Sequence, residues 1–261
     1  MFDTSRLQAA LDLGLEGQEE AVSRLHALLH ETPSDEERGW IELYEARFLA
    51  QLLRVTEAKE QLAHLSRMWK STPEHDAQIA VAYALMHEME GNPSQTLREL
   101  DRVAKKYSAS WEQPGARDLY EEIQANRGRL LVGEGRHEEA LPLLEETLAF
   151  ERDKPGQFYY NLGYCYFKAK EWDKSEQWLK EALRRDLHPA IASATHYYLG
   201  RLEYAKGSYA RAIKEFELAV TYALQAKRPP EVIYAEMAKA YGHLGMPEER
   251  SRYNDMAKSA E

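Results

Sequence analysis

A few side chains in this sequence are of types that could bind a metal ion or act in catalysis. His26 and His30 are four residues apart, a spacing that places both imidazoles on one face of a helix. A metal site needs three or four ligands, and no third ligand is indicated nearby, so we expect no metal. Cys165 lies inside a predicted helix, flanked by Tyr164 and Tyr166. A nucleophilic cysteine needs an accessible, electropositive setting with a base nearby, so we expect a buried core residue instead.

Motifs of catalytic or cofactor-binding proteins are absent from the sequence. It contains no G-x-x-x-x-G-K-[ST], no G-x-G-x-x-G, no H-E-x-x-H and no paired C-x-x-C. Glutamate pairs such as Glu138–Glu139 fall at predicted helix starts or on polar faces, where the helix dipole and solubility explain them. The sequence therefore predicts a protein that is not an enzyme and uses no cofactor.

Composition narrows the class of protein and of partner. The chain has 261 residues, of which 44% are hydrophobic, enough for a continuous core. Its net charge of −10 argues against nucleic-acid binding. The single cysteine excludes an internal disulfide, the first residues lack the basic region of a signal peptide, and no apolar run is long enough to cross a membrane. We expect a soluble cytoplasmic protein with no membrane insertion.

The most regular stretch of the chain is 158–189, FYYNLGYCYFKAKEWDKSEQWLKEALRRDLHP. It carries four residues at the spacing Y-x2-L-G-x2-Y, which are Tyr159, Leu162, Gly163 and Tyr166. The pattern predicts two antiparallel helices, Tyr159–Ala169 and Trp172–Arg185, with small Gly163 at their closest approach. The stretch resembles a tetratricopeptide repeat, with Tyr159 in the place where that family usually has tryptophan.

Small residues recur at corresponding positions along the chain: Ala84, Gly128, Gly163, Gly200 and Ala238, at steps of 44, 35, 37 and 38 residues. These steps are close to the tetratricopeptide period of about 34 residues. The resemblance therefore implies an all-α, right-handed α-solenoid of about seven antiparallel helix pairs in a single domain, 1–261. The approximate repeats are 4–31, 38–70, 77–107, 118–150, 156–189, 193–226 and 230–260.

The ends of this array and one insertion are less regular. The second pair is predicted as Trp40–Leu53 and Glu57–Trp69, with a register uncertain by about one residue. The final helix, Pro247–Ser259, has only a narrow apolar stripe and is predicted to face solvent. Trp111 lies in a loop with the turn signal Pro114–Gly115, and it either covers the solenoid edge or contacts a partner.

In the tetratricopeptide family, the first helices of successive pairs line a concave groove in which partners bind. Carried over residue by residue, the resemblance implies a partner-binding groove formed by Arg129, Tyr160, Tyr164, Phe167, Lys168, Tyr197, Arg201, Tyr204 and Lys239. Cations interleaved with aromatic rings suit a peptide with acidic and apolar side chains. The alternative is that the tyrosines pack against neighbouring helices and the cations cover them with their stems. The residue types leave both interpretations open.

The predicted function is a non-enzymatic protein–protein interaction scaffold or adaptor that binds a peptide or helix in this groove. The alternative is a sensor of a signalling peptide or small ligand in a bacterial regulatory system, although seven helix pairs leave no room for an effector domain. A receptor for chaperone C-terminal tails is disfavoured, because the lysine–asparagine pair that it needs is replaced by Ala125/Arg129, Tyr160/Tyr164 and Tyr197/Arg201.

Overall fold

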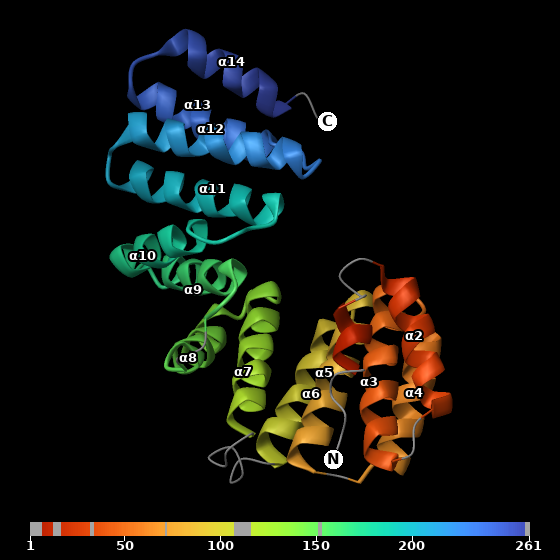
Figure 1. The fold of residues 1–261 in the computed structure, drawn as a ribbon. Coiled ribbons are helices and arrows are strands. Elements are labelled where there is room, and N and C mark those ends of the chain that lie inside the picture. Colours follow the sequence, from red (N-terminus) through yellow and green to blue (C-terminus); the bar gives the residue numbers. More distant parts are fainter. Residues whose placement is uncertain are drawn as a thin grey trace. The chain divides into compact units, whose positions relative to one another are not determined.

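The computed structural model of the chain describes residues 7–12, 17–31, 34–70, 72–106, 116–150 and 153–258 (Figure 1). Every regular element within these ranges is an α-helix, and none is a strand. The predicted all-α class, built from antiparallel helix pairs, is therefore confirmed. The chain divides into two compact units, Met1–Leu130 and Leu131–Glu261, which we describe separately. The single-domain organisation stays a prediction.

The N-terminal unit contains residues 7–12, which are helical, and the helices α2 (Gln18–Glu31), α3 (Asp35–Gln51), α4 (Val55–Met68), α5 (Pro73–Met89), α6 (Pro93–Lys106) and most of α7 (Ala116–Gly133). Helix α3 packs on α2 and α4, and α5 packs on α6. Fully buried side chains such as Leu43, Leu62 and Met86 join α3, α4 and α5 into one core cluster. The apolar stripe of each helix is thus buried on its neighbours, as a helix-on-helix fold requires.

Helix α3 begins five residues before its predicted start, Trp40. The Ser34 hydroxyl accepts a hydrogen bond from the Glu37 backbone N–H at 3.2 Å and donates to the Glu37 carboxylate at 2.6 Å. The Ser34 side chain thus satisfies the Glu37 N–H, one of the groups in the first turn that have no partner inside the helix. The polar first turn hid the true start from a search for apolar spacing.

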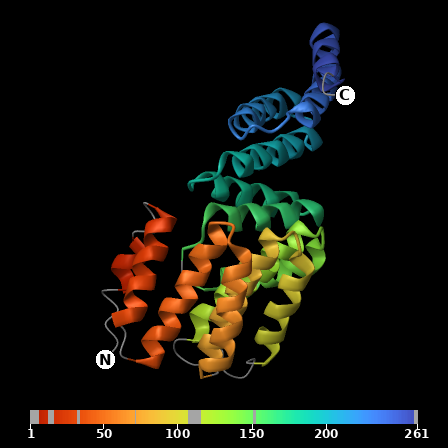
Figure 2. The same ribbon diagram turned by 90° about the vertical axis from the view of Figure 1, so that its right-hand side faces the viewer.

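The C-terminal unit contains α8 (His137–Leu148), α9 (Gly156–Lys168), α10 (Trp172–Leu183), α11 (Pro189–Ala205), α12 (Tyr209–Gln225), α13 (Glu231–His243) and α14 (Pro247–Lys258). The pairs α9/α10, α11/α12 and α13/α14 pack antiparallel, and α10 and α12 also contact the first helix of the next pair (Figure 2). Phe216 is buried beside Gly200, where an added Cβ would lie 2.6 Å from its ring. No described residue of α14 is buried, as predicted for a solvent-facing helix.

The turns inside the pairs share one backbone feature. Each has a residue with positive φ seven positions after the small residue of the first helix: Leu53 (63°), Gly91 (74°), Gly135 (77°), Lys170 (62°), Gly207 (76°) and Gly245 (70°). This regularity fixes the register of the second repeat, because Leu53 makes Ala46 its small residue. Ala46 is fully buried, as that position requires.

Two regions named in the sequence analysis cannot be compared with the structure. The loop with Trp111 lies outside the described residues, as does part of the first predicted pair. None of the helices that the structure describes is both long and apolar enough to span a membrane.

Candidate partner-binding surface

In the C-terminal unit the first helix α11 contacts the first helices of the preceding and following pairs, α9 and α13. They carry eight of the nine predicted groove residues: Tyr160, Tyr164, Phe167 and Lys168 on α9, Tyr197, Arg201 and Tyr204 on α11, and Lys239 on α13. We call the face that carries these side chains the first-helix surface. Arg129 is half-buried on α7 in the N-terminal unit, so the structure does not place it with the others.

Tyr198, which the sequence analysis did not select, connects the aromatic side chains of α9. Its ring centroid lies 4.8 Å from that of Tyr164, 5.0 Å from Phe167 and 6.5 Å from Tyr160. Aromatic pairs at these separations stabilise the packing by more than the burial of their surface area alone would give. The repeat positions that the resemblance assigns to the groove do not include Tyr198. The two adjacent tyrosines, Tyr197 and Tyr198, could have drawn attention to it.

Two cations lie over the aromatic cluster. The ammonium of Lys168 is 5.4 Å from the Tyr164 ring centroid. The guanidinium of Arg201 is 5.3 Å from the Phe167 centroid and 5.9 Å from that of Tyr197. Both side chains are exposed, and neither forms a salt bridge within the described residues. Their positive charges are therefore held by rings instead of carboxylates.

The predicted cation on α13 differs from these two. The ammonium of Lys239 lies 2.8 Å from a carboxylate oxygen of Glu236, three residues earlier on the same helix. The positive charge of Lys239 is therefore partly neutralised within the chain itself. We therefore expect Lys239 to contribute less to binding than Arg201.

A second aromatic cluster surrounds Tyr204. Its ring centroid lies 5.3 Å from Tyr209 and 5.4 Å from His243, and the Tyr209 and His243 rings stack at 4.5 Å. Tyr209 is the first residue of α12, so a second helix supplies part of this cluster. Reading the first helices alone could not identify it.

The tyrosines Tyr160, Tyr164, Tyr197 and Tyr198 are all half-buried on α9 and α11. Burial raises the pKa of both Tyr160 and Tyr198, so these phenols remain neutral well above physiological pH. They act mainly as packing between α9 and α11. Tyr164 and Tyr197 are half-buried beside the exposed cations, and each keeps part of its ring accessible.

His137 on α8 borders the cluster. Its ring is 5.0 Å from Tyr164 in an edge-to-face arrangement. Burial lowers the pKa of His137, and the charge of Lys168 lowers it further, so the imidazole is neutral at neutral pH. Its Nδ1 atom is buried and has no hydrogen-bond partner in the described part of the chain.

The side chains considered for chemistry do not assemble a reactive site. Cys165 is 1% exposed, and burial raises its pKa to about 12, so it is a thiol at neutral pH. The Nδ1 atom of His26 faces Glu45 at 3.1 Å, and its ring lies edge-on to His30 at 5.5 Å. Within the described ranges, no group of three or more His, Cys, Asp or Glu side chains could hold a metal ion.

The tetratricopeptide repeat family model matches residues 125–189 and 180–229. Among curated proteins, the BBSome complex member BBS4 of Bos taurus is 26% identical over 168 residues, which are 62% of this chain and 30% of that protein. The transcription activator GutR of Bacillus subtilis (strain 168) is 25% identical over 114 residues, 41% of this chain and 14% of GutR. The chain thus spans less than a third of the length of either relative.

Solved structures show the same fold at lower sequence identity. One chain in the structure of the APC/C hetero-tetramer Cut9-Hcn1 aligns with 100% of this chain over 47% of its own length, with a TM-score of 0.66 and 14% identity. Pseudomonas aeruginosa pilF aligns over 86% of this chain and 92% of its own, with a TM-score of 0.60 and 17% identity. These similarities establish the fold alone.

Proposed function

We propose that the protein is a non-enzymatic scaffold or adaptor that binds a peptide or helix of a partner protein, because the tetratricopeptide repeat family model matches residues 125–189 and 180–229 of this chain. Repeats of this family generally serve protein–protein interaction. We assign the binding to the first-helix surface, as the concave groove of the array, with a cytoplasmic location and with neither nucleic acid nor membrane as partner.

The observation that carries this proposal is the environment of Arg201. In a chain with a net charge of −10, this exposed guanidinium lies over Phe167 and Tyr197 with no carboxylate salt bridge among the described residues. Lys168 is held over Tyr164 in the same way. An arginine positioned by rings retains its donors for a partner, and tyrosine and arginine are the residue types that most often dominate binding energy at interfaces.

The chemistry of the surface defines the partner. Its half-buried rings offer apolar area, and the cations Lys168 and Arg201 offer charge-assisted hydrogen bonds to carboxylates. The matching ligand is a segment with both acidic and apolar side chains. Because the charge contacts are exposed, binding should weaken as salt rises.

The test compares two exposed arginines of the same unit. Arg201→Ala removes one cation of the first-helix surface, whereas Arg184→Ala removes the arginine that directly follows α10, whose side chain is 74% exposed. Both proteins, with wild type, are used for affinity capture from lysate of the source organism, with quantitative mass spectrometry of the captured proteins. We expect Arg201→Ala alone to lose the specific partner. Equal recovery by all three would refute the proposal.

Tyr164→Ala is a poorer single probe than Arg201→Ala. The Tyr164 ring contacts Tyr160, Tyr198 and His137, so its removal also weakens packing between helices. Tyr164→Phe keeps the packing and removes only the hydroxyl. It should therefore preserve the melting temperature while reporting whether the partner uses that hydroxyl.

A sensor of a signalling peptide or small ligand in a bacterial regulatory system is the second candidate. The matching segment of the transcription activator GutR favours it, although that segment is 14% of GutR. The two candidates differ in the size of the bound species. Native mass spectrometry of protein purified from its source would show a small added mass for a sensor and a protein-sized mass for an adaptor.

A further inference from the structure

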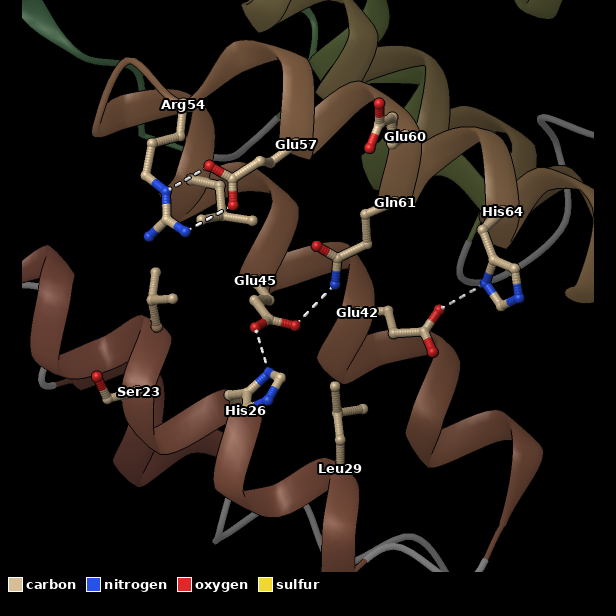
Figure 3. A pocket seen from close by; sticks show the side chains of 12 residues that line it. Ser23, His26, Leu29, Glu42, Glu45, Arg54, Glu57, Glu60, Gln61 and His64 are labelled. Carbon is tan, nitrogen blue, oxygen red and sulfur yellow. Dashed lines mark hydrogen bonds and ion pairs between the residues drawn. The ribbon is translucent and has the colours of Figure 1, made fainter.

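An open pocket of about 760 Å³ lies between α2, α3 and α4 in the N-terminal unit (Figure 3). Its apolar wall includes Val22, Leu29 and Leu49, and its polar side chains come mainly from α3 and α4. It lies where α3, a first helix, faces two second helices. It is therefore separate from any surface formed by first helices alone.

The charges around this pocket are unbalanced. Four carboxylates and one arginine line it. Arg54 donates to both carboxylate oxygens of Glu57, at 2.9 and 2.6 Å, so these two charges offset each other. Glu42, Glu45 and Glu60 remain, and no Lys or Arg within the described residues forms a salt bridge with them. The pocket therefore has an excess of negative charge next to an apolar wall.

Glu42 is the side chain that points to a missing ligand. It is 9% exposed, and its carboxylate faces the pocket, with His64 Nδ1 at 3.5 Å, longer than a good hydrogen bond (Figure 3). No other described residue forms a hydrogen bond or ion pair with this carboxylate. The neighbouring Glu45, in contrast, accepts hydrogen bonds from Gln61 at 2.7 Å and faces His26 at 3.1 Å. Glu42 is thus a mostly buried carboxylate whose one polar partner is the long contact with His64, so a donor from a ligand would be stabilised there.

From these observations we propose that the pocket binds an arginine side chain of a partner protein. The planar guanidinium has five N–H donors in a fork that can serve carboxylates on two helices, here Glu42 on α3 and Glu60 on α4. The methylene stem of the arginine lies along the apolar wall. The described residues hold no group of three metal-ligating side chains, so a metal ion does not explain the pocket.

The test uses a fluorescently labelled pentapeptide, Ser-Leu-Arg-Leu-Ser, with blocked ends. Two matched peptides replace its arginine by citrulline, an uncharged analogue of the same shape, or by lysine. Anisotropy titrations of the full chain should show saturable binding of the arginine peptide. Binding of the citrulline and lysine peptides should be at least about tenfold weaker, the size of effect expected when one charged, forked contact is lost.

Four variants locate the binding site. Glu42→Gln and Glu60→Gln should each weaken the arginine peptide about fivefold to tenfold. Glu138→Gln, an exposed carboxylate on α8, makes the same charge change in the other unit and should leave binding unchanged. Glu60 is exposed, so its variant tests the proposal even if Glu42→Gln fails to fold, which circular dichroism would reveal. Arg201→Ala should bind the peptide normally, which separates this site from the first-helix surface.

Four results would overturn the assignment. If the wild-type chain showed no saturable binding of the arginine peptide, the assignment would be wrong. Equal affinity for arginine and citrulline would show that charge is not recognised. Equal affinity for lysine would show that the forked geometry is not recognised. An equal effect of Glu138→Gln would assign the binding to diffuse negative charge.

Discussion

The hydroxyl of Ser175 donates a hydrogen bond of 2.8 Å to the carbonyl oxygen of Gly163, and both residues are buried. The same bond joins Thr96 to the carbonyl of Ala84 at 3.1 Å, with the same separation of twelve residues. In each pair, the small residue of the first helix lets the second helix approach closely. The hydroxyl of the second helix then donates to a backbone carbonyl of the first. The bond thus recurs in two of the described pairs, where a hydroxyl stands twelve residues after the small residue.

We expect Ser175→Ala to reduce stability by about 1 kcal/mol, the net contribution of one buried hydrogen bond. Alanine fits this position, because Ala212 occupies the equivalent place after Gly200 and is fully buried. The loss therefore reports the bond and not a steric change. Chemical denaturation followed by circular dichroism would measure it. An unchanged unfolding midpoint would show that the hydroxyl contributes nothing net.

Close packing at Gly163 gives a second prediction. A Cβ added there would lie 2.9 Å from the backbone nitrogen of Leu179 and 2.8 Å from its side chain. Backbone cannot move aside cheaply, so Gly163→Ala should destabilise the unit by about 1–3 kcal/mol. The control is Gly133→Ala on α7, where an added Cβ meets nothing within 4 Å.

Gly133→Ala should be neutral or slightly stabilising, since alanine favours a helix more than glycine does. Melting temperatures of the two variants would separate the effects. A similar shift in both would mean that helix propensity, and not the contact between α9 and α10, determines the outcome at Gly163.

How far the sequence predicts the fold depends on which signal a residue carries. Gly163 and Tyr166 could be placed because core spacing repeats along the chain, and the structure agrees. The start of α3 could not, because Ser34 and Glu37 signal it through polar hydrogen bonds and not through apolar periodicity. Leu53 concealed the register of the second repeat, because a leucine stands where four other turns have a glycine with positive φ.

The candidate surface was less predictable than the fold. A repeat position specifies which helix face a residue occupies, so Tyr164 and Arg201 could be selected from spacing. It does not specify which rings meet across helices, so the contacts of Tyr198 needed coordinates. The pocket around Glu42 was missed because its side chains come from three helices, and no spacing within one helix reports their convergence.

The half-buried Tyr198 predicts a loss of stability at alkaline pH. Burial raises the pKa of Tyr198 above its ordinary value of 10.0, mainly because phenolate is poorly solvated between α9 and α11. Above about pH 10 the unfolded chain loses this proton while the folded chain keeps it, so folding becomes less favourable. Below pH 10 both states keep the proton, and the contribution is fully present.

The measurement is the free energy of unfolding between pH 9 and pH 11.5, for wild type and Tyr198→Phe. The variant lacks the ionising group and retains the ring, so its stability should fall less steeply. Lysine deprotonation affects both proteins alike and cancels in the comparison. Parallel curves would contradict the assignment of Tyr198 as a phenol kept neutral by its surroundings.

The turn between α9 and α10 predicts the opposite kind of effect, a stabilising substitution. Lys170 has φ of 62°, in the left-handed region, where a side chain costs about 1 kcal/mol or more. Gly207 holds the same place after α11 with φ of 76°, at no such cost. Lys170→Gly should therefore relieve strain. Part of the gain is offset because glycine makes the unfolded chain more flexible, which leaves a net increase of at most about 1 kcal/mol.

Gly207→Ala should lower stability by about 1–2 kcal/mol, because alanine must adopt the strained conformation while an added Cβ meets nothing within 4 Å. Paired denaturation curves test the difference in sign, and a loss of stability in Lys170→Gly would show that its side chain contributes more than its backbone conformation costs.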